Sequence, residues 1–349
     1  MSAFAEALIA WQKQHGRHDL PWQASRDAYR VWLSEIMLQQ TQVDTVIPYY
    51  QRFLARFPDL ASLAAAPVDD VLALWSGLGY YARARNLHTA AQQVVRSHGG
   101  RFPATAAEIA ELPGIGRSTA AAIAAFCFGE RAAILDGNVK RVLARHFGID
   151  GFPGVRAVEQ SMWALAESLL PAQGVDTYTQ SLMDLGATVC TRSRPRCAEC
   201  PVTNSCVARQ QGRQAELPTP RPTRVVPERQ SRVLIACNGG AVLLQKRPAH
   251  GIWGGLYALP EIPDELDAEA HALTLGLRVV GVAKALPPLR HAFTHFRLTL
   301  EALVLDVVGE GVSDPAWRWT SQQEWDSLGL PTPVRRLLNS LVQDDRTLR

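Results

Sequence analysis

The 349-residue chain lacks any stretch that approaches the roughly 20 consecutive apolar residues needed by a membrane-spanning helix. Its N-terminal segment carries an early glutamate and no long apolar run, which argues against a signal peptide. A large excess of one charge is also missing, since the formal net charge is +3. We therefore expect a cytoplasmic protein without a membrane anchor, in which only local basic clusters could meet a polyanion.

Internal repeats and low-complexity tracts are absent as well, and the periodicity of the chain divides it in three. Residues 1–210 show helical periodicity without strand-like alternation, and the sequence after the connector alternates as strands do. The connector places four prolines among arginines. We predict an all-helical domain (1–210), a Pro/Arg-rich linker (211–229) and an α+β domain (230–349). Helices are expected at 28–40, 43–56, 68–75, 82–97, 118–127, 138–147, 155–169, 321–330 and 333–342, and strands at 231–247, around Asn238-Gly239-Gly240, and 296–308.

Cysteine is scarce, with six residues, yet four of them form the pattern C-x6-C-x2-C-x5-C. Zinc sites usually draw two ligand pairs from separate elements, whereas four cysteine thiolates are the standard ligands of a four-iron cluster. The pattern favours one 4Fe-4S cluster, with zinc and purely structural cysteines as alternatives. No dinucleotide fingerprint suggests redox chemistry, so a structural cluster is expected. Its ligands would be Cys190, Cys197, Cys200 and Cys206.

A glycine-rich turn, LPGIG, directly precedes the alanine-rich helical segment 118–127. Such a turn exposes backbone N–H groups at a helix start, where they and the helix dipole favour a phosphate oxygen. Gly114 and Gly116 would let the backbone approach closely because neither has a β-carbon. An ordinary turn between two helices is the alternative.

Five motifs occur together: SEIMLQQTQV, GLGYYARARNLH, LPGIGRSTA, LDGNVKR and the cysteine segment. In this order they resemble the helix-hairpin-helix DNA glycosylases of the endonuclease III superfamily, and most closely the A/G-specific adenine DNA glycosylases, the MutY family. The likeness runs from about Leu20 to Cys206 and is looser beyond. It implies a monomeric enzyme that hydrolyses the N-glycosidic bond of adenine opposite 8-oxoguanine or guanine in double-stranded DNA.

Two carboxylates are the candidate catalytic pair. The resemblance makes Asp136 the essential aspartate of the superfamily, and its place before a helix predicts an N-cap. Glu35 lies on an otherwise apolar stripe, so burial should raise its pKa. Breaking a base–sugar bond needs an ionised carboxylate beside the sugar and an acid for the purine. We assign these roles to Asp136 and Glu35, with Glu35 protonating adenine N7 and then activating water.

The resemblance also assigns residues that contact DNA. Ser118 stands where bifunctional relatives carry a Schiff-base lysine, and a hydroxyl cannot form an imine, so a monofunctional enzyme is predicted. Gln180 is expected near the flipped adenine. Contacts at the gap and the opposite base are assigned to Gln40, Thr41, Leu78 and Tyr80, for which a helix end or the core is the alternative.

The C-terminal segment WGGLYALPE resembles the opening of a Nudix fold, with Gly255 and Glu261 at the Nudix spacing. The following EAHALT lacks the clustered carboxylates of that signature, so no magnesium site for pyrophosphate hydrolysis is expected. The resemblance makes this domain the reader of 8-oxoguanine through the loop HAFTHF. Its contacts are assigned to Phe293, Thr294 and His295, with packing beneath a turn as the alternative for Phe293.

Two other functions remain open from sequence. One is an endonuclease III-like enzyme that also cleaves the strand, which a lysine at position 118 would have favoured. The other is a non-catalytic DNA-damage-binding protein, against which the presence of both Glu35 and Asp136 argues.

Overall fold

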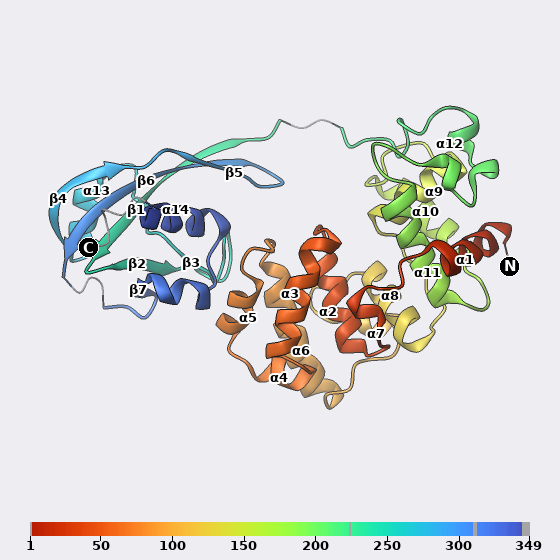
Figure 1. Ribbon diagram of the computed structural model, residues 1–349, viewed down its shortest axis with the longest axis horizontal. Helices are drawn as coiled ribbons and strands as arrows, with labels where there is room; N and C mark the ends of the chain where they lie inside the picture. The colour runs from red at the N-terminus through yellow and green to blue at the C-terminus, as the bar shows by residue number, and fades with distance from the viewer. Residues whose placement is uncertain (1, 223–224, 310–312, 344–349) are drawn as a thin grey trace. The chain divides into compact units, whose positions relative to one another are not determined.

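The computed structural model describes residues 2–222, 225–309 and 313–343. The chain divides into two compact units whose elements are labelled in Figure 1. The first unit comprises Met1–Tyr50, Phe57–Ala64 and Thr89–Thr223. The second comprises Gln51–Arg56, Ala65–His88 and Arg224–Arg349, so it includes two pieces of the helical region.

The helical region contains no strand among its described residues up to Gln210, as predicted. All seven helices expected there are present, and none of their ends shifts by more than two residues. None of the helices in the described ranges is both long and apolar enough to cross a membrane. The α-helices of this region are α1 (Ala3–His15), α2 (Ala28–Leu38), α3 (Val43–Arg56), α4 (Leu60–Ala65), α5 (Val68–Trp75), α6 (Ala82–His98), α7 (Ala106–Ala110), α8 (Arg117–Phe128), α9 (Gly137–Phe147), α10 (Arg156–Ser168), α11 (Val175–Asp184) and α12 (Val207–Gln210).

Short-range signals start these helices, and burial of their apolar faces stabilises them. Asp27 caps α2 by accepting a hydrogen bond from the Arg30 N–H at 2.9 Å. In the first unit α1, α8, α9, α10 and α11 share one core, to which they contribute Leu8, Ala122, Leu143, Met162 and Leu182. A π-helical turn, Leu185–Val189, continues α11 towards the cysteine segment.

A mixed β-sheet forms the centre of the second unit, with the strand order β3-β2-β1-β6-β4. The long strands β1 and β6 run parallel, and the other pairings are antiparallel. Strand β5 pairs with β6, and β7 with β2. The predicted hairpin is confirmed, since Asn238 pairs with Ala241 across a two-glycine turn. The strands are β1 (Glu228–Asn238), β2 (Ala241–Lys246), β3 (Tyr257–Ala258), β4 (Arg278–Ala285), β5 (Leu289–Ala292), β6 (Arg297–Val308) and β7 (Trp317–Ser321).

Each face of this sheet has its own hydrophobic core, because side chains alternate along a strand. On one face Ile235 packs in a core with Leu338 of α14 (Thr332–Gln343). On the other, Leu234 packs with Ala272 of α13 (Ala268–Thr274).

The segment 321–330 differs from expectation, because it forms only a 3₁₀ helix, Gln322–Ser327. Ser321 and Glu324 cap its start as a helix requires. Leu328 then adopts an extended conformation, and both Leu328 and Leu330 are buried in the core. Tertiary packing of these leucines outweighs the helical pattern.

The helical piece 65–88 belongs to the second unit through polar contacts with the sheet domain. The hydroxyls of Ser76 and Tyr81 both donate to the Leu330 carbonyl, at 2.8 and 3.2 Å. The Lys246 ammonium pairs with Asp69 at 2.6 Å. The C-terminal domain is therefore joined to helical sequence far from it along the chain.

Candidate active site

A cleft of about 1290 Å³ opens in the first unit. Its walls come from the segment between α1 and α2, the end of α2, the starts of α8 and α9, and α11. Six residues that the sequence assigns to catalysis or DNA contact line this one cleft, although they lie far apart in the chain. They are Glu35, Gln40, Thr41, Ser118, Asp136 and Gln180.

Glu35 lines the cleft from α2, and its neighbours Ser34 and Ile36 in that helix are buried. No residue in the described ranges donates a hydrogen bond to its carboxylate. Burial, followed by the negative charge of Asp136, raises the pKa of Glu35 from 4.5 to about 8. Glu35 therefore holds a proton at neutral pH, as its place on an apolar stripe predicted.

Asp136 is the N-cap of α9, as predicted. Its Oδ1 accepts a hydrogen bond from the Val139 N–H at 2.8 Å, which fixes the carboxylate at the cleft wall. Burial raises the pKa of Asp136, while hydrogen bonds from Val139 and Asn138 and the charges of Arg141 and Lys140 act to lower it. Asp136 thus has hydrogen-bond donors and nearby cations that Glu35 lacks, and these oppose the effect of burial on its pKa.

The glycine turn lies between α7 and α8, and the Ser118 side chain ties it to the catalytic segment. Ser118 Oγ accepts a hydrogen bond from the Leu135 N–H at 2.9 Å, next to Asp136. Gly114 has a φ of 78°, where a side chain would be strained. Gly116 is different, since its φ is −86° and a Cβ there would meet nothing within 4 Å. The space beside Gly116 is open for a ligand.

Two of the assigned DNA contacts have an unusual backbone. Gln40 and Tyr80 adopt left-handed conformations, with φ of 58° and 49°, which non-glycine residues take up at a cost of about 1–3 kcal/mol. Gln40 lies in the cleft of the first unit, and Tyr80 is 42% exposed in the second. Leu78, by contrast, is buried in the second unit.

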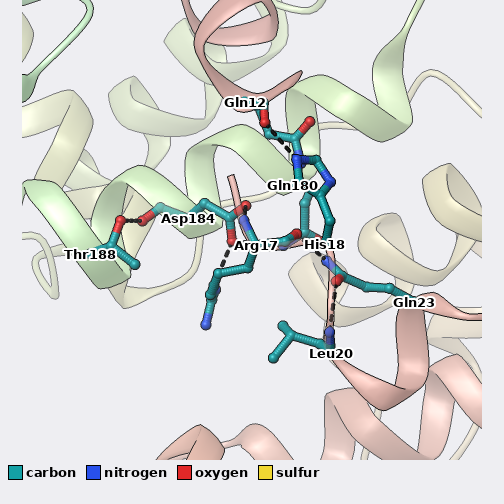
Figure 2. Close-up of polar contacts among 8 residues, drawn as sticks. All are labelled: Gln12, Arg17, His18, Leu20, Gln23, Gln180, Asp184 and Thr188. Atoms are coloured by element: carbon teal, nitrogen blue, oxygen red, sulfur yellow. Dashed lines mark hydrogen bonds and ion pairs between the residues drawn. The ribbon is translucent and has the colours of Figure 1, made fainter. Parts of the chain in front are cut away.

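Gln180 lies on α11 in a hydrogen-bonded network that reaches the N-terminal segment (Figure 2). Its Nε2 donates to Asp184 Oδ1 at 2.8 Å. Arg17 donates to the same carboxylate from Nε at 2.8 Å and from its backbone N–H at 3.0 Å. Arg17 and Asp184 were not predicted as site residues, since residues 167 positions apart leave no local signal of their pairing.

The four cysteines lie close enough to influence one another. Burial, and then the charges of the other three thiols, raise the pKa of Cys200 to about 11. Arg145, which is buried, donates to Cys190 Sγ at 3.4 Å and to the carbonyls of Thr191 and Arg192. No three His, Cys, Asp or Glu side chains within the described ranges form a group that could hold a single metal ion. Four thiols beside a buried cation fit a cluster that spreads its ligands over several irons.

The loop HAFTHF forms the turn between β5 and β6 in the second unit. Phe293 stacks on the buried Phe296 with ring centroids 4.4 Å apart, and its N–H donates to the Phe296 carbonyl. Thr294 and His295 at the tip are exposed. The aromatic pair therefore supports the tip of the loop, where the Thr294 side chain is exposed and the His295 ring packs against the Phe296 ring edge-on.

At the Nudix-like segment, Glu261 is engaged in an ion pair. Its carboxylate lies 3.1 Å from Arg247 Nη1. The EAHALT segment lies within α13. This ion pair engages the one acidic residue at the Nudix spacing, and the lack of a magnesium site stays a prediction.

Comparisons with known proteins agree with this architecture. Residues 33–168, which include both catalytic candidates, match the HhH-GPD superfamily base excision DNA repair proteins, and residues 232–340 match the NUDIX domain. Among solved structures, a thermostable thymine-DNA glycosylase is 29% identical, with a TM-score of 0.55 over 60% of this chain and 95% of that one. An endonuclease III in a non-covalent DNA complex, 19% identical with a TM-score of 0.51 over 60% of this chain and 94% of that one, shares the fold of the helical region.

Relatives that match nearly the whole chain carry one name. "Adenine DNA glycosylase" of Buchnera aphidicola subsp. Acyrthosiphon pisum (strain APS) is 34% identical over 98% of both chains. The Homo sapiens protein of that name is 33% identical over 97% of this chain and 73% of its own. Together with two carboxylates in one cleft and a Nudix-like second domain, these similarities show that the chain belongs to the adenine DNA glycosylases, base excision repair hydrolases that act on N-glycosyl bonds.

Proposed function

We propose that this protein removes adenine paired with 8-oxoguanine or guanine from double-stranded DNA, as a monomeric, monofunctional glycosylase. The observation that carries the proposal is the meeting of Glu35 and Asp136 in one cleft, where burial and the Asp136 charge raise the pKa of Glu35 to about 8. A pair of carboxyl groups with separated proton affinities is what acid-assisted cleavage of a glycosidic bond requires.

Glu35 acts first as a general acid. The target adenine leaves the base stack and enters the cleft, because the two carboxyl groups cannot reach its glycosidic bond within a duplex. Protonated Glu35 transfers its proton to N7, which turns the purine into a better leaving group. The resulting Glu35 carboxylate then accepts a proton from the water that attacks the sugar.

Asp136 stabilises the sugar as the bond breaks. Positive charge develops on the sugar in an oxocarbenium-like transition state, and an ionised carboxylate beside it lowers the barrier. The hydrogen bond from the Val139 N–H keeps this carboxylate in place, and the nearby cations oppose the effect of burial on its pKa. Ser118 has no amine for an imine, so water completes the reaction and the strand stays intact.

The remaining contacts divide between the two units. In the helical domain the turn at Gly114 and Gly116, with Ser118, binds a phosphate, which is supported by the open space beside Gly116. Gln180 contacts the flipped adenine. Contacts at the gap and the opposite base come from Gln40, Thr41, Leu78 and Tyr80.

The C-terminal domain reads 8-oxoguanine. Phe293 supports the loop tip by stacking on Phe296, and the exposed Thr294 and His295 contact the lesion or its backbone. The Thr294 hydroxyl can donate one hydrogen bond and accept others. We retain the division into a glycosylase domain (1–210), a linker (211–229) and a lesion-recognition domain (230–349).

A single 4Fe-4S cluster on Cys190, Cys197, Cys200 and Cys206 completes the helical domain. When bound, the cluster supplies positive iron centres that allow the four thiols to bind as thiolates. Arg145 would stabilise this ligand set through its contact with Cys190 Sγ. The cluster stiffens a segment rich in arginine, which suits a nucleic-acid contact. Such an enzyme works in the cytoplasm, at the nucleoid.

Base release from defined duplexes tests this proposal. The protein is incubated with duplexes that carry adenine opposite 8-oxoguanine, adenine opposite guanine, or thymine glycol, with and without borohydride. We expect adenine release from the first two, no cleavage at thymine glycol and no trapped covalent imine. Cleavage at thymine glycol with a trapped imine would instead identify a bifunctional enzyme of the endonuclease III type.

A further inference from the structure

Asp184 is a completely buried carboxylate behind the wall of the cleft. It is the last residue of α11, one helical turn beyond Gln180, and its side chain is 0% exposed. Figure 2 shows its carboxylate between Arg17 and Gln180. Oδ1 accepts from Arg17 Nε and Gln180 Nε2, both at 2.8 Å, and Oδ2 accepts from the Arg17 N–H at 3.0 Å. Three donors therefore converge on two acceptor atoms.

This arrangement determines which end of the Gln180 amide faces the cleft. An ionised carboxylate only accepts hydrogen bonds, so the donor end of the amide must point at Asp184. Arg17 Nε places a positive charge 2.8 Å from this buried carboxylate. The Gln180 carbonyl oxygen is left for the cleft, and no residue in the described ranges donates a hydrogen bond to it. Gln180 and Arg17 line the cleft together with Glu35.

A fixed acceptor distinguishes adenine from 6-oxopurines. Adenine carries an amino group at C6, which donates hydrogen bonds, whereas guanine and hypoxanthine carry an oxygen there. A glutamine side chain that could rotate would offer its amide NH₂ group to that oxygen, and both kinds of base would then bind. A glutamine whose amide NH₂ group is already hydrogen-bonded to a carboxylate can only present its carbonyl oxygen, which repels the 6-oxo group.

We propose that Asp184 is a positioning residue that sets base selectivity, because it holds the Gln180 amide with the carbonyl oxygen towards the 6-substituent of the flipped purine. The inference rests on the proposed function, in which Gln180 contacts the target base. Asp184 does not touch the substrate and acts through Gln180. The cost of leaving a buried acceptor unpaired and facing a second acceptor is the source of the discrimination.

The first test uses the unaltered protein with three bases opposite 8-oxoguanine: adenine, purine without a 6-substituent, and hypoxanthine. Single-turnover release rates are each divided by the non-enzymatic depurination rate of the same nucleotide, which removes intrinsic lability. A fixed acceptor predicts a corrected rate for hypoxanthine roughly 5- to 150-fold below that for purine. Equal rates, or a faster rate for hypoxanthine, would mean that the amide rotates freely and would overturn the proposal.

The second test compares Asp184→Asn, Gln180→Met and the double variant. An asparagine offers one acceptor oxygen and a donor to three donors, so the Gln180 amide can turn. The hypoxanthine-to-purine ratio should then rise towards one in Asp184→Asn. Gln180→Met should remove the same discrimination, and Asp184→Asn should add nothing in that background, as expected for residues that act as one unit. An equal shift from Asp184→Asn in both backgrounds would show an effect that bypasses Gln180.

The matched control is Asp150→Asn, which removes an exposed carboxylate paired with Arg213 outside the cleft and should leave the ratio unchanged. If Asp184→Asn does not fold, the three-base comparison on the unaltered protein together with Gln180→Met decides the matter. Failure of the proposed function and failure of the positioning role give different results. Absence of adenine release by the unaltered protein contradicts the proposed function, whereas normal release with an unchanged ratio in Gln180→Met and Asp184→Asn contradicts only the positioning role.

Discussion

Glu35 of the first unit and Glu261 of the second are both assigned from sequence patterns, yet their surroundings are opposite. Glu261 is half exposed and paired with Arg247 Nη1 at 3.1 Å. Glu35 faces Asp136 in a cleft, and its pKa rises to about 8. A carboxylate matched to a cation stays charged and inert, whereas one kept from any cation can hold and release a proton near neutral pH.

The two domains differ in what surrounds their carboxylates. The Nudix-like spacing of Gly255 and Glu261 survives, but the partner of Glu261 is an arginine rather than further carboxylates that could share a cation. The cleft of the first unit holds two carboxyl groups together, those of Glu35 and Asp136. The charged groups around a carboxylate, more than the sequence motif that contains it, determine whether it can exchange a proton near neutral pH.

The largest expected effect follows from removing the acid in the cleft. Glu35→Gln should reduce adenine release by roughly 10²- to 10⁴-fold, because an amide cannot protonate N7. Asp136→Asn should act alike, since it removes the negative charge beside the sugar. DNA affinity should stay close to that of the unaltered protein. Single-turnover rates and binding on the same duplex measure both, and a variant that keeps more than about a tenth of the rate would refute its assigned role.

Stability provides the control for Glu35→Gln. The folded protein holds a proton on Glu35 up to about pH 8, whereas the unfolded chain releases it near 4.5. The contribution of Glu35 to the free energy of unfolding is therefore fully present below pH 4.5. It is lost as the pH rises towards 8. Glutamine removes that dependence, so the variant should unfold at a higher temperature than the parent at pH 8. A variant that is less stable there would mean that Glu35 has an unseen cationic partner.

A smaller effect is expected at the loop tip of the second unit. Thr294→Ala should lower the preference for adenine opposite 8-oxoguanine over adenine opposite guanine by roughly 5- to 150-fold, the range for one lost hydrogen bond to a desolvated group. Thr294→Ser, which keeps the hydroxyl, is the matched control and should change little. The ratio of single-turnover rates on the two duplexes is measured at fixed salt, because phosphate contacts depend on salt. The point variant is preferable to a deletion, since Ser76 and Tyr81 donate to Leu330 of that domain.

The smallest effect is expected at Glu261 of the second unit. Glu261→Gln removes a half-exposed ion pair and no catalytic group, so base release should stay within roughly twofold of the parent. Added magnesium should not change the rates of either protein. A large loss of base release in this variant would mean that the second unit contributes a carboxylate to catalysis, and the contrast with Glu35 would disappear.

Local patterns were sufficient to predict the helices, the β1–β2 hairpin and the capping role of Asp136. They also predicted the raised pKa of Glu35, because an acidic residue on an apolar stripe is expected to face inward. Local patterns could not predict partners that lie far apart in the sequence. The contact of Arg17 with Asp184, and the union of residues 65–88 with the C-terminal domain, depend on chain segments that meet only in the folded state.

The central claim is that a protonated Glu35 drives adenine release, and the pH dependence of the single-turnover rate tests it most directly. The rate is measured from pH 6 to 10 on a duplex with adenine opposite 8-oxoguanine, with protein in excess. Because only the protonated carboxyl donates, the rate should be constant below a pKa of about 8 and fall about tenfold per pH unit above it. A rate that stays constant to pH 10 would contradict the assignment of Glu35 as the acid.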